Sequence, residues 1–278
     1  FTYALKLAKE VDADIILATD PDADRLGVYA KDAKTGEYVA FTGNMSGMLI
    51  AEYILREKTA MGTMPKNPAL VETIVTTDMA KAIAKAYGVE LIEVLTGFKY
   101  IGEQIRLFEE NNTFEYVFGL EESYGCLAGT HARDKDAVVS SMLICQMAAW
   151  YKNKGMTLVD GLNEIYAEYG YYLDHLDSYT LKGKDGAEKI QQLMVWFRNK
   201  GTELFEGIKE VIDFEKGIRD LPIENVLKFL FTDGTWMAVR PSGTEPKIKV
   251  YYSVRQDSRE LAEKRLDDIR SVILDTVK

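Results

Sequence analysis

The sequence predicts an α/β protein in which parallel-sheet α/β domains are followed by a C-terminal α+β domain. Strand and helix patterns alternate through residues 1–172, apolar strand-like runs there end in polar loops, and strands joined by short turns replace this alternation afterwards. The chain has 278 residues, of which 47% are hydrophobic, so it can bury more than one core. We place the domains at residues 1–42, 43–172 and 173–278.

The first segment is expected to be the end of an α/β domain rather than a whole one. Helical spacing in "FTYALKLAKEV" (1–11) precedes an apolar strand at 14–18, an acidic loop, and the strands "RLGVYA" and "YVAF" around the turn "KTGE". The chain starts at Phe1, without Met, within this helical pattern. We therefore expect that an N-terminal part of the protein precedes it.

The second segment alternates helix and strand regularly. The pattern predicts helices at 46–60, 79–88, 98–111 and 134–155, and strands at 69–77, 89–95 and 115–119. Asp78 is expected to cap the helix that Gly88 ends, and the Met and aromatic positions of "SSMLICQMAAWYKN" are expected in the core. Such alternation implies a parallel sheet with right-handed crossovers, whose ligands bind beyond the carboxyl ends of the strands.

The third segment changes in character. A strand is expected in "HLDSYTLKG" and a helix at 186–200, followed by strands in "NVLKFLFTDG", "TWMAVRP" and "KIKVYYSV" and a last helix from Ser258. Successive strands without intervening helices predict an antiparallel sheet. No internal repeat stands out in the sequence.

Composition limits the partners. The net charge is −10, with 44 acidic residues against 34 Lys and Arg, so an extended nucleic-acid surface is not expected, although a local cationic pocket is compatible with this balance. Cys126 and Cys145 form neither a disulfide framework nor a CxxC zinc motif, which favours a reducing, cytoplasmic setting. No apolar run approaches the roughly 20 residues of a membrane span, so no membrane partner is expected.

The stretch "DPDADR" follows the first apolar strand, and we expect it, like "LTGFKY" and "GLEESYG", at the carboxyl end of a strand in a parallel sheet. Asp20, Asp22 and Asp24 alternate, and three close carboxylates need a counter-charge that a divalent cation supplies. Oxygen ligands favour Mg²⁺. An EF-hand is rejected, because Arg25 and Lys31 stand where its Gly and Glu belong. Two other interpretations of the stretch remain: a solvated acidic turn, and an aspartyl-phosphate phosphatase of the haloacid dehalogenase type. The phosphatase pattern usually continues with Gly and then Thr or Val after its DxD, where this chain has Ala23 and Asp24.

The stretch "RPSGTEP" suggests a phosphate cradle. Arg240 offers a guanidinium fork, Ser242 and Thr244 offer hydroxyls, and Gly243 leaves backbone N–H groups accessible. The alternative is a plain hairpin turn, since Pro, Ser and Gly are common in turns. The flanking Arg240 and Thr244 favour the phosphate interpretation.

Three weaker stretches follow predicted strands or precede a helix. The acids of "GLEESYG" suit acceptance of hydrogen bonds from sugar hydroxyls, though a solvated loop is the alternative. "LTGFKY" opens a helix whose N–H groups can meet an anion, and "HARDKDAV" places cations before the next helix. Their shared position in one parallel sheet makes them informative. The candidate residues are Thr96, Gly97, Lys99, Glu121, Ser123, Arg133 and Lys135.

Taken together, "DPDADR", "LTGFKYIG", "GLEESYG", "RDKDAV" and "RPSGTEPKIKVY" resemble the α-D-phosphohexomutase superfamily, most closely its phosphoglucomutases. The motifs stand in the family's order over most of the chain. The resemblance implies four domains around a cleft: three related α/β domains and a C-terminal domain like the TATA-binding-protein fold. It also implies a phosphoserine that gives its phosphate to a sugar phosphate, through a hexose bisphosphate that returns the other phosphate.

The resemblance also implies roles for the candidate residues. Asp20, Asp22 and Asp24 would hold Mg²⁺. Arg25 and Lys135 would lie near the metal and the reacting groups. The sugar would be met by Thr96, Gly97, Lys99, Glu121, Ser123 and Arg133. The phosphate that does not react would be clasped by Arg240, Ser242, Gly243 and Thr244.

One departure from the family pattern is important. None of the six prolines follows His-Asn, so the family's Ser-His-Asn-Pro type loop is absent. Pro21 stands where Gly is frequent, which we take as tolerated. The expectation is a fragment of a Mg²⁺-dependent phosphoglucomutase that binds hexose phosphates weakly, does not convert glucose 1-phosphate to glucose 6-phosphate alone, and needs a missing N-terminal domain. The alternatives are a phosphomannomutase, a metal-dependent phosphatase and a non-catalytic phosphosugar-binding module.

Overall fold

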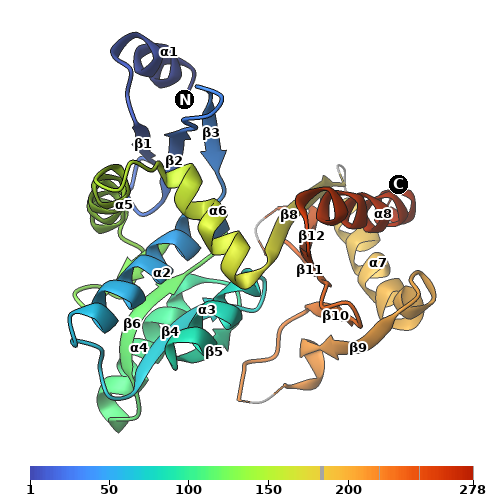
Figure 1. The fold of residues 1–278 in the computed structure, drawn as a ribbon. Coiled ribbons are helices and arrows are strands. Elements are labelled where there is room, and N and C mark those ends of the chain that lie inside the picture. Colours follow the sequence, from blue (N-terminus) through green and yellow to red (C-terminus); the bar gives the residue numbers. More distant parts are fainter. Residues whose placement is uncertain (182–184, 219, 244, 278) are drawn as a thin grey trace. The chain divides into compact units, whose positions relative to one another are not determined.

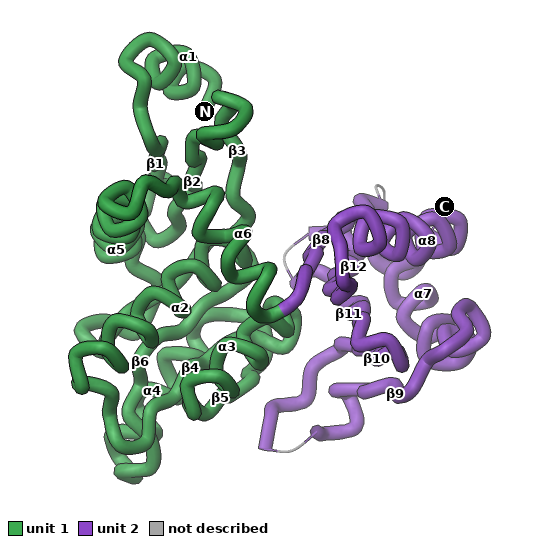
Figure 2. The backbone as a smooth tube through the Cα atoms, in the orientation of Figure 1, with its two compact units in different colours: residues 1–169 green, residues 170–278 purple. Residues whose placement is uncertain are grey.

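The computed structural model describes residues 1–181, 185–218, 220–243 and 245–277. The chain divides into two compact units, Phe1–Tyr169 and Gly170–Lys278 (Figure 2). In the described residues, no helix combines the length and the apolar character that crossing a membrane requires.

Unit 1 begins with a helix and a small antiparallel sheet. Helix α1 (Thr2–Val11) leads to β1 (Ile15–Thr19), β2 (Leu26–Lys31) and β3 (Tyr38–Phe41), in the order β1-β2-β3 (Figure 1). The sequence placed "DPDADR" at the end of a parallel strand, and this is wrong, because β1 pairs with β2 in antiparallel register. A short apolar run carries no information about the direction of its neighbour.

A second sheet in unit 1 is mostly parallel. Its order is β5-β4-β6-β7, with β4 (Pro68–Thr73), β5 (Glu90–Val94) and β6 (Glu115–Leu120) parallel and β7 (Cys126–Ala128) antiparallel to β6. "LTGFKY" and "GLEESYG" therefore leave the same edge of one sheet, as expected. The strand expected at 69–77 ends at Thr73. A turn begins there, and it is closed by the Thr76 N–H, which donates to Thr73 O at 2.9 Å.

Helices cover both faces of this sheet. They are α2 (Gly43–Ala60), α3 (Met79–Tyr87), α4 (Phe98–Asn111) and α5 (Ala137–Lys152), and α6 (Leu158–Tyr169) packs on α2, α3, α5 and β2. Ile101 and Ile105 of α4 pack with Val71 of β4 on one face. On the other face, an added Cβ at Gly47 of α2 would lie 2.5 Å from Leu120 of β6. The result is an α/β/α arrangement.

Two helix expectations need correction. Asp78 stands at the N-cap of α3 but makes no capping hydrogen bond, and its carboxylate instead accepts from Lys81 Nζ at 2.9 Å. Gly88 does end α3, with φ 65°. In α5 the expected core position Met147 is buried, whereas Met142 is 58% exposed. The helix is apolar on more than one face, so its sequence does not tell which face is covered.

Unit 2 is an α+β unit. Its described antiparallel sheet has the order β8-β12-β11-β10-β9. The strands are β8 (Tyr171–Thr180), β9 (Ile208–Asp213), β10 (Leu227–Phe231), β11 (Trp236–Pro241) and β12 (Lys247–Gln256). Helices α7 (Gly186–Lys200) and α8 (Arg259–Val277) share a core with Phe229 and Val250. Strand β9 was not expected, because "IKEVID" alternates weakly.

Candidate functional site

The acidic loop between β1 and β2 folds around Asp20. Asp20 Oδ1 accepts hydrogen bonds from the N–H groups of Asp24 at 3.2 Å and Arg25 at 3.1 Å. Ala23 takes a left-handed conformation, with φ 56°, which turns the chain back. One ligand oxygen from each of Asp20, Asp22 and Asp24 lies within 4.8 Å of the other two. The loop therefore converges three carboxylates on one point.

The donor set of this loop fits a small hard cation. Asp24 Oδ1 is buried, and no described residue gives it a hydrogen bond; Arg25 Nε lies 3.7 Å away. Burial raises the pKa of Asp20, but hydrogen bonds from Arg25 and Asp24 outweigh it and hold this pKa below its ordinary value. Mg²⁺ binds carboxylate oxygens together with water and substrate phosphate, so these three carboxylates suit it.

Lys135 lies against the acidic loop. Its Nζ is 2.7 Å from Asp24 Oδ2, and its side chain is only 11% exposed. The aliphatic stem packs on Gly125, where an added Cβ would overlap it. Burial lowers the pKa of Lys135, but the hydrogen bond with Asp24 and the charges of Asp134 and Glu121 outweigh this and raise it above its ordinary value. Lys135 therefore stays a cation beside the carboxylates.

Glu121 joins the loops that follow β5 and β6. Its carboxylate is buried, and the backbone N–H of Gly97 acts to lower the pKa of this carboxylate. Burial raises the pKa of Glu121, although Lys135 and Arg25 act in the opposite direction. Next to Gly97 in the chain, the Thr96 Oγ1 atom is buried and has no hydrogen-bond partner among the described residues. An acceptor and a free hydroxyl are thus available to a polyhydroxylated ligand.

Backbone hydrogen bonds tie these distant motifs together. Leu26 N–H donates to Tyr124 O at 3.0 Å, and Arg25 and Gly125 form a β-bridge. Ala137 N–H, at the start of α5, donates to Ala23 O at 3.0 Å. The carboxylate loop, the "GLEESYG" loop and the "RDKDAV" segment therefore form one site, although they lie up to about a hundred residues apart in the chain.

The two acidic hairpins have the same construction. Each loop is closed between its first and last residues, Asp20 N–H to Arg25 O at 3.3 Å and Glu121 N–H to Gly125 O at 2.8 Å. The helix before each hairpin ends in a non-glycine residue with a left-handed backbone, Asp12 after α1 and Asn112 after α4. Each loop contains one more such residue, Ala23 in the first and Tyr124 in the second. The structure thus contains a repeat that the sequence did not reveal.

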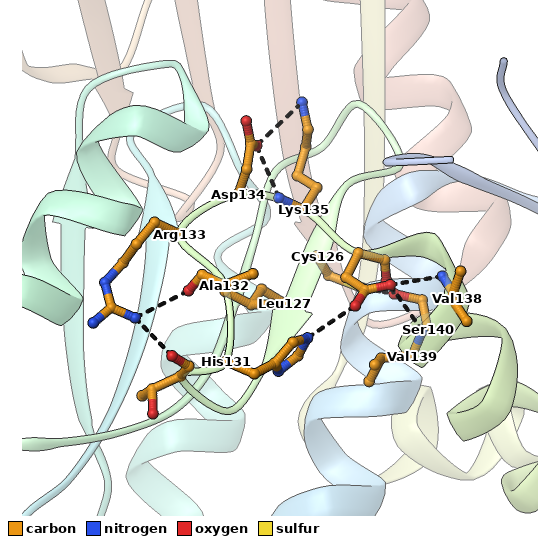
Figure 3. Close-up of polar contacts among 12 residues, drawn as sticks. Cys126, Leu127, His131, Ala132, Arg133, Asp134, Lys135, Val138, Val139 and Ser140 are labelled. Carbon is orange, nitrogen blue, oxygen red and sulfur yellow. Dashed lines mark hydrogen bonds and ion pairs between the residues drawn. The ribbon is translucent and has the colours of Figure 1, made fainter. Parts of the chain in front are cut away.

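Three predicted residues stand at the margin of this site. Lys99 is exposed, with its ammonium 4.6 Å from the centre of the Tyr100 ring. Ser123 is half-buried in the "GLEESYG" loop. Arg133 donates to Thr130 O at 2.7 Å and Ala132 O at 3.1 Å and pairs with Glu109 Oε2 at 2.6 Å. In Figure 3 its guanidinium points away from Lys135, so its observed contacts hold the loop.

The predicted phosphate loop lies in unit 2. Arg240 Nε is buried without a hydrogen-bond partner among the described residues, and Nη2 is 3.7 Å from Glu224 Oε1. Ser242 N–H donates to Lys247 O at 2.8 Å, which closes the loop around Gly243. Thr244 lies outside the described residues. Lys249 lies directly opposite Arg240 in the β11–β12 register. It was not predicted as a site residue, although the alternation of polar and apolar residues in "KIKVYY" could have indicated it.

Comparison with known families identifies the class of protein. The family model for the phosphoglucomutase/phosphomannomutase alpha/beta/alpha domain III matches residues 42–169, and the model for the C-terminal domain matches residues 195–271. Together they match well over half of the chain. The chain belongs to the phosphoglucomutase/phosphomannomutase family.

Among curated proteins, a phosphoglucomutase of Staphylococcus epidermidis is 38% identical over 281 residues, which is 96% of this chain and 50% of the relative. A phosphoglucomutase of Staphylococcus aureus is 38% identical over 268 residues, 92% of this chain and 47% of the relative. The chain therefore spans about half the length of the curated relatives it matches.

Solved structures show the same fold. Parafusin, a phosphoglucomutase from Paramecium in an open form, matches with a TM-score of 0.70 at 20% identity, over 95% of this chain and 45% of that one. A putative phosphomannomutase from Thermus thermophilus matches with a TM-score of 0.62 at 20% identity, over 98% of this chain and 50% of that one.

Proposed function

We propose that this chain carries the metal loop, the sugar-recognition loops and the phosphate cradle of a Mg²⁺-dependent phosphoglucomutase. The reaction would interconvert glucose 1-phosphate and glucose 6-phosphate in the cytoplasm, through a phosphoserine and a hexose bisphosphate. The observation that carries this proposal is the convergence of Asp20, Asp22 and Asp24 with Lys135 at 2.7 Å from Asp24. The preference for glucose is supported by the phosphoglucomutases among the relatives.

The arrangement suits phosphoryl transfer. Such a reaction needs charge neutralisation at the moving group and firm positioning of the rest of the substrate. When bound by Asp20, Asp22 and Asp24, Mg²⁺ would neutralise negative charge on a phosphoryl group. Lys135 supplies a second positive charge that the protein itself holds in place, because its stem is packed on Gly125.

Recognition of the sugar and of the second phosphate falls to other residues. Glu121 offers a buried carboxylate, and Thr96 offers a hydroxyl that has no hydrogen-bond partner among the described residues. In unit 2, the Nε of Arg240, which has no hydrogen-bond partner among the described residues, would bind the phosphate that does not react, together with the Ser242 hydroxyl and Lys249. Lys99, Ser123 and Arg133 stay proposed substrate contacts, and Arg133 would have to exchange its present partners to serve.

The chain alone is not expected to turn substrate over, because it contains no Ser-His-Asn-Pro loop to carry the phosphate. A coupled assay, in which glucose-6-phosphate dehydrogenase reports glucose 6-phosphate, should show no robust conversion of glucose 1-phosphate. Robust conversion would contradict this part of the proposal. Release of inorganic phosphate would instead favour the metal-dependent phosphatase.

Binding tests the rest of the proposal. Calorimetric titration with glucose 1,6-bisphosphate in the presence of Mg²⁺ should give a saturable heat. Arg240→Met should weaken binding about tenfold or more, since a charge-assisted bidentate contact is lost. The matched control is Arg265→Met, which removes a half-buried arginine that pairs with Asp233 at 2.8 Å. No binding by the unaltered chain, or equal losses in both variants, would refute the phosphate assignment.

A further inference from the structure

The loop of residues 130–136 is the part of unit 1 that presents Lys135 to the carboxylates. This loop and the first residue of α5 both touch the acidic loop between β1 and β2: Lys135 through Nζ at 2.7 Å from Asp24, and Ala137 through its N–H at 3.0 Å from Ala23 O. Asp136 stands between them. Whatever fixes Asp136 therefore fixes both contacts.

Asp136 is held from three sides. Its Oδ1 accepts from Val138 N–H at 2.8 Å and Val139 N–H at 3.0 Å, so it caps α5, and its own N–H donates to Cys126 O at 2.9 Å. Its Oδ2 lies 2.8 Å from His131 Nε2. An N-cap uses only one side-chain oxygen, so the bond with His131 is additional to capping.

The bond between His131 and Asp136 closes the loop across five residues. Burial raises the pKa of Asp136, but hydrogen bonds from His131 and from the N–H groups of Val139 and Val138 outweigh it and lower the pKa below its ordinary value. The carboxylate is thus ionised and makes a charge-assisted hydrogen bond. Arg133 ties the other side of the loop to Glu109 of α4.

We propose that His131 and Asp136 are positioning residues: they form a clasp that keeps the Lys135 ammonium and the Ala137 N–H on the acidic loop. The relevance of the clasp to catalysis rests on the function proposed above, whereas its existence does not. Without His131, Asp136 still caps α5 and Arg133 still holds Glu109, but Asp136 and the neighbouring Lys135 lose one of their restraints. The Lys135 side chain then samples positions away from Asp24.

The test compares His131→Ala and His131→Gln in the whole chain, without metal or sugar. His131→Ala should raise the hydrogen-exchange rate of the Ala137 amide about tenfold, since one charge-assisted hydrogen bond is lost. Acetylation of Lys135 by acetic anhydride, followed by mass spectrometry, should speed up several-fold. His131→Gln should restore both rates, because its amide group can donate to Asp136. Amides of β4 and β6 should exchange as before.

The matched control is His175→Ala, which removes the chain's other histidine and its 3.0 Å contact with Asp177 in unit 2. It should leave Ala137 and Lys135 unchanged. The clasp is refuted if His131→Ala leaves both rates as they were, if it raises exchange throughout unit 1 in equal proportion, or if Gln fails to restore them. Absence of Mg²⁺ binding by the unaltered chain would refute the proposed function alone, since neither readout requires metal.

Discussion

Replacing Lys135 by Met should destabilise unit 1 by about 2 kcal/mol when no metal is present. Met keeps the stem that packs on Gly125 but removes the charge 2.7 Å from Asp24, whose side chain is 22% exposed. Breaking a fully buried pair costs about 3–5 kcal/mol, and an exposed pair contributes about 0–1 kcal/mol. The exposures of 11% and 22% lie nearer the buried case. For a unit of this size, about 2 kcal/mol lowers Tm by about 4–8 °C.

The chain provides a matched control for this substitution. Lys152 Nζ also lies 2.7 Å from a carboxylate oxygen, that of Asp14, but the two side chains are 69% and 62% exposed. Lys152→Met should therefore cost less than about 0.5 kcal/mol. Calorimetric scans in EDTA should show the difference. Added Mg²⁺ should raise the Tm of Lys135→Met more than that of the unaltered chain, because Asp24 no longer has a competing cation. Equal Tm losses in the two variants would refute the reasoning.

Two further predictions concern the same site. The pKa of Glu121 is raised, mainly by burial, so its protonated form stabilises the fold below its ordinary pKa and this contribution disappears as pH rises through the raised value. The Tm of Glu121→Gln minus the Tm of the unaltered chain should therefore be more positive at pH 7 than at pH 4. An equal Tm difference at the two pH values would contradict this. Gly125→Ala should cost about 1–3 kcal/mol, because its Cβ would overlap the stem of Lys135. The control is Gly243→Ala, at a glycine that has open space around it and no left-handed φ; if urea unfolding shows Gly125→Ala to be no more costly than Gly243→Ala, crowding is not the cause.

Much of the fold could be predicted because apolar periodicity reports burial. The helices at α2, α3 and α4 and the parallel strands β4, β5 and β6 follow from such patterns. Strand direction is not encoded this way, which is why β1 was assigned to a parallel sheet although it pairs with β2 in antiparallel register. Strand β7 has only three residues, too few to show a period.

The convergence of the site was only partly predictable. Carboxylates and cations at strand ends indicated which loops to examine, but the bonds that bring them together are between backbone groups, as in Leu26 N–H to Tyr124 O. Such bonds leave no signature in residue type. The likeness of the two hairpins is hidden for the same reason, since Ala23 and Tyr124 share a left-handed conformation but no chemistry.

Polar side chains near the site also resisted prediction. His131 and Arg133 lie in one motif with Lys135, yet the structure engages His131 with Asp136 and Arg133 with Glu109. A short cationic motif does not tell which side chains face a ligand and which hold the loop. Only the direction of each side chain separates these roles, and Figure 3 shows that Arg133 and Lys135 diverge.

The measurement that tests the account most directly is a Mg²⁺ titration of the chain and its Asp22→Asn variant by calorimetry. Asp22 is exposed and contributes one of the three converging oxygens, so Asn should remove a charged ligand without disturbing the loop. We predict a loss of affinity of about tenfold or more. Asp32→Asn, in the next turn of the same sheet, should bind as the unaltered chain does. Equal Mg²⁺ binding by all three proteins would contradict the assignment of this loop as the metal site.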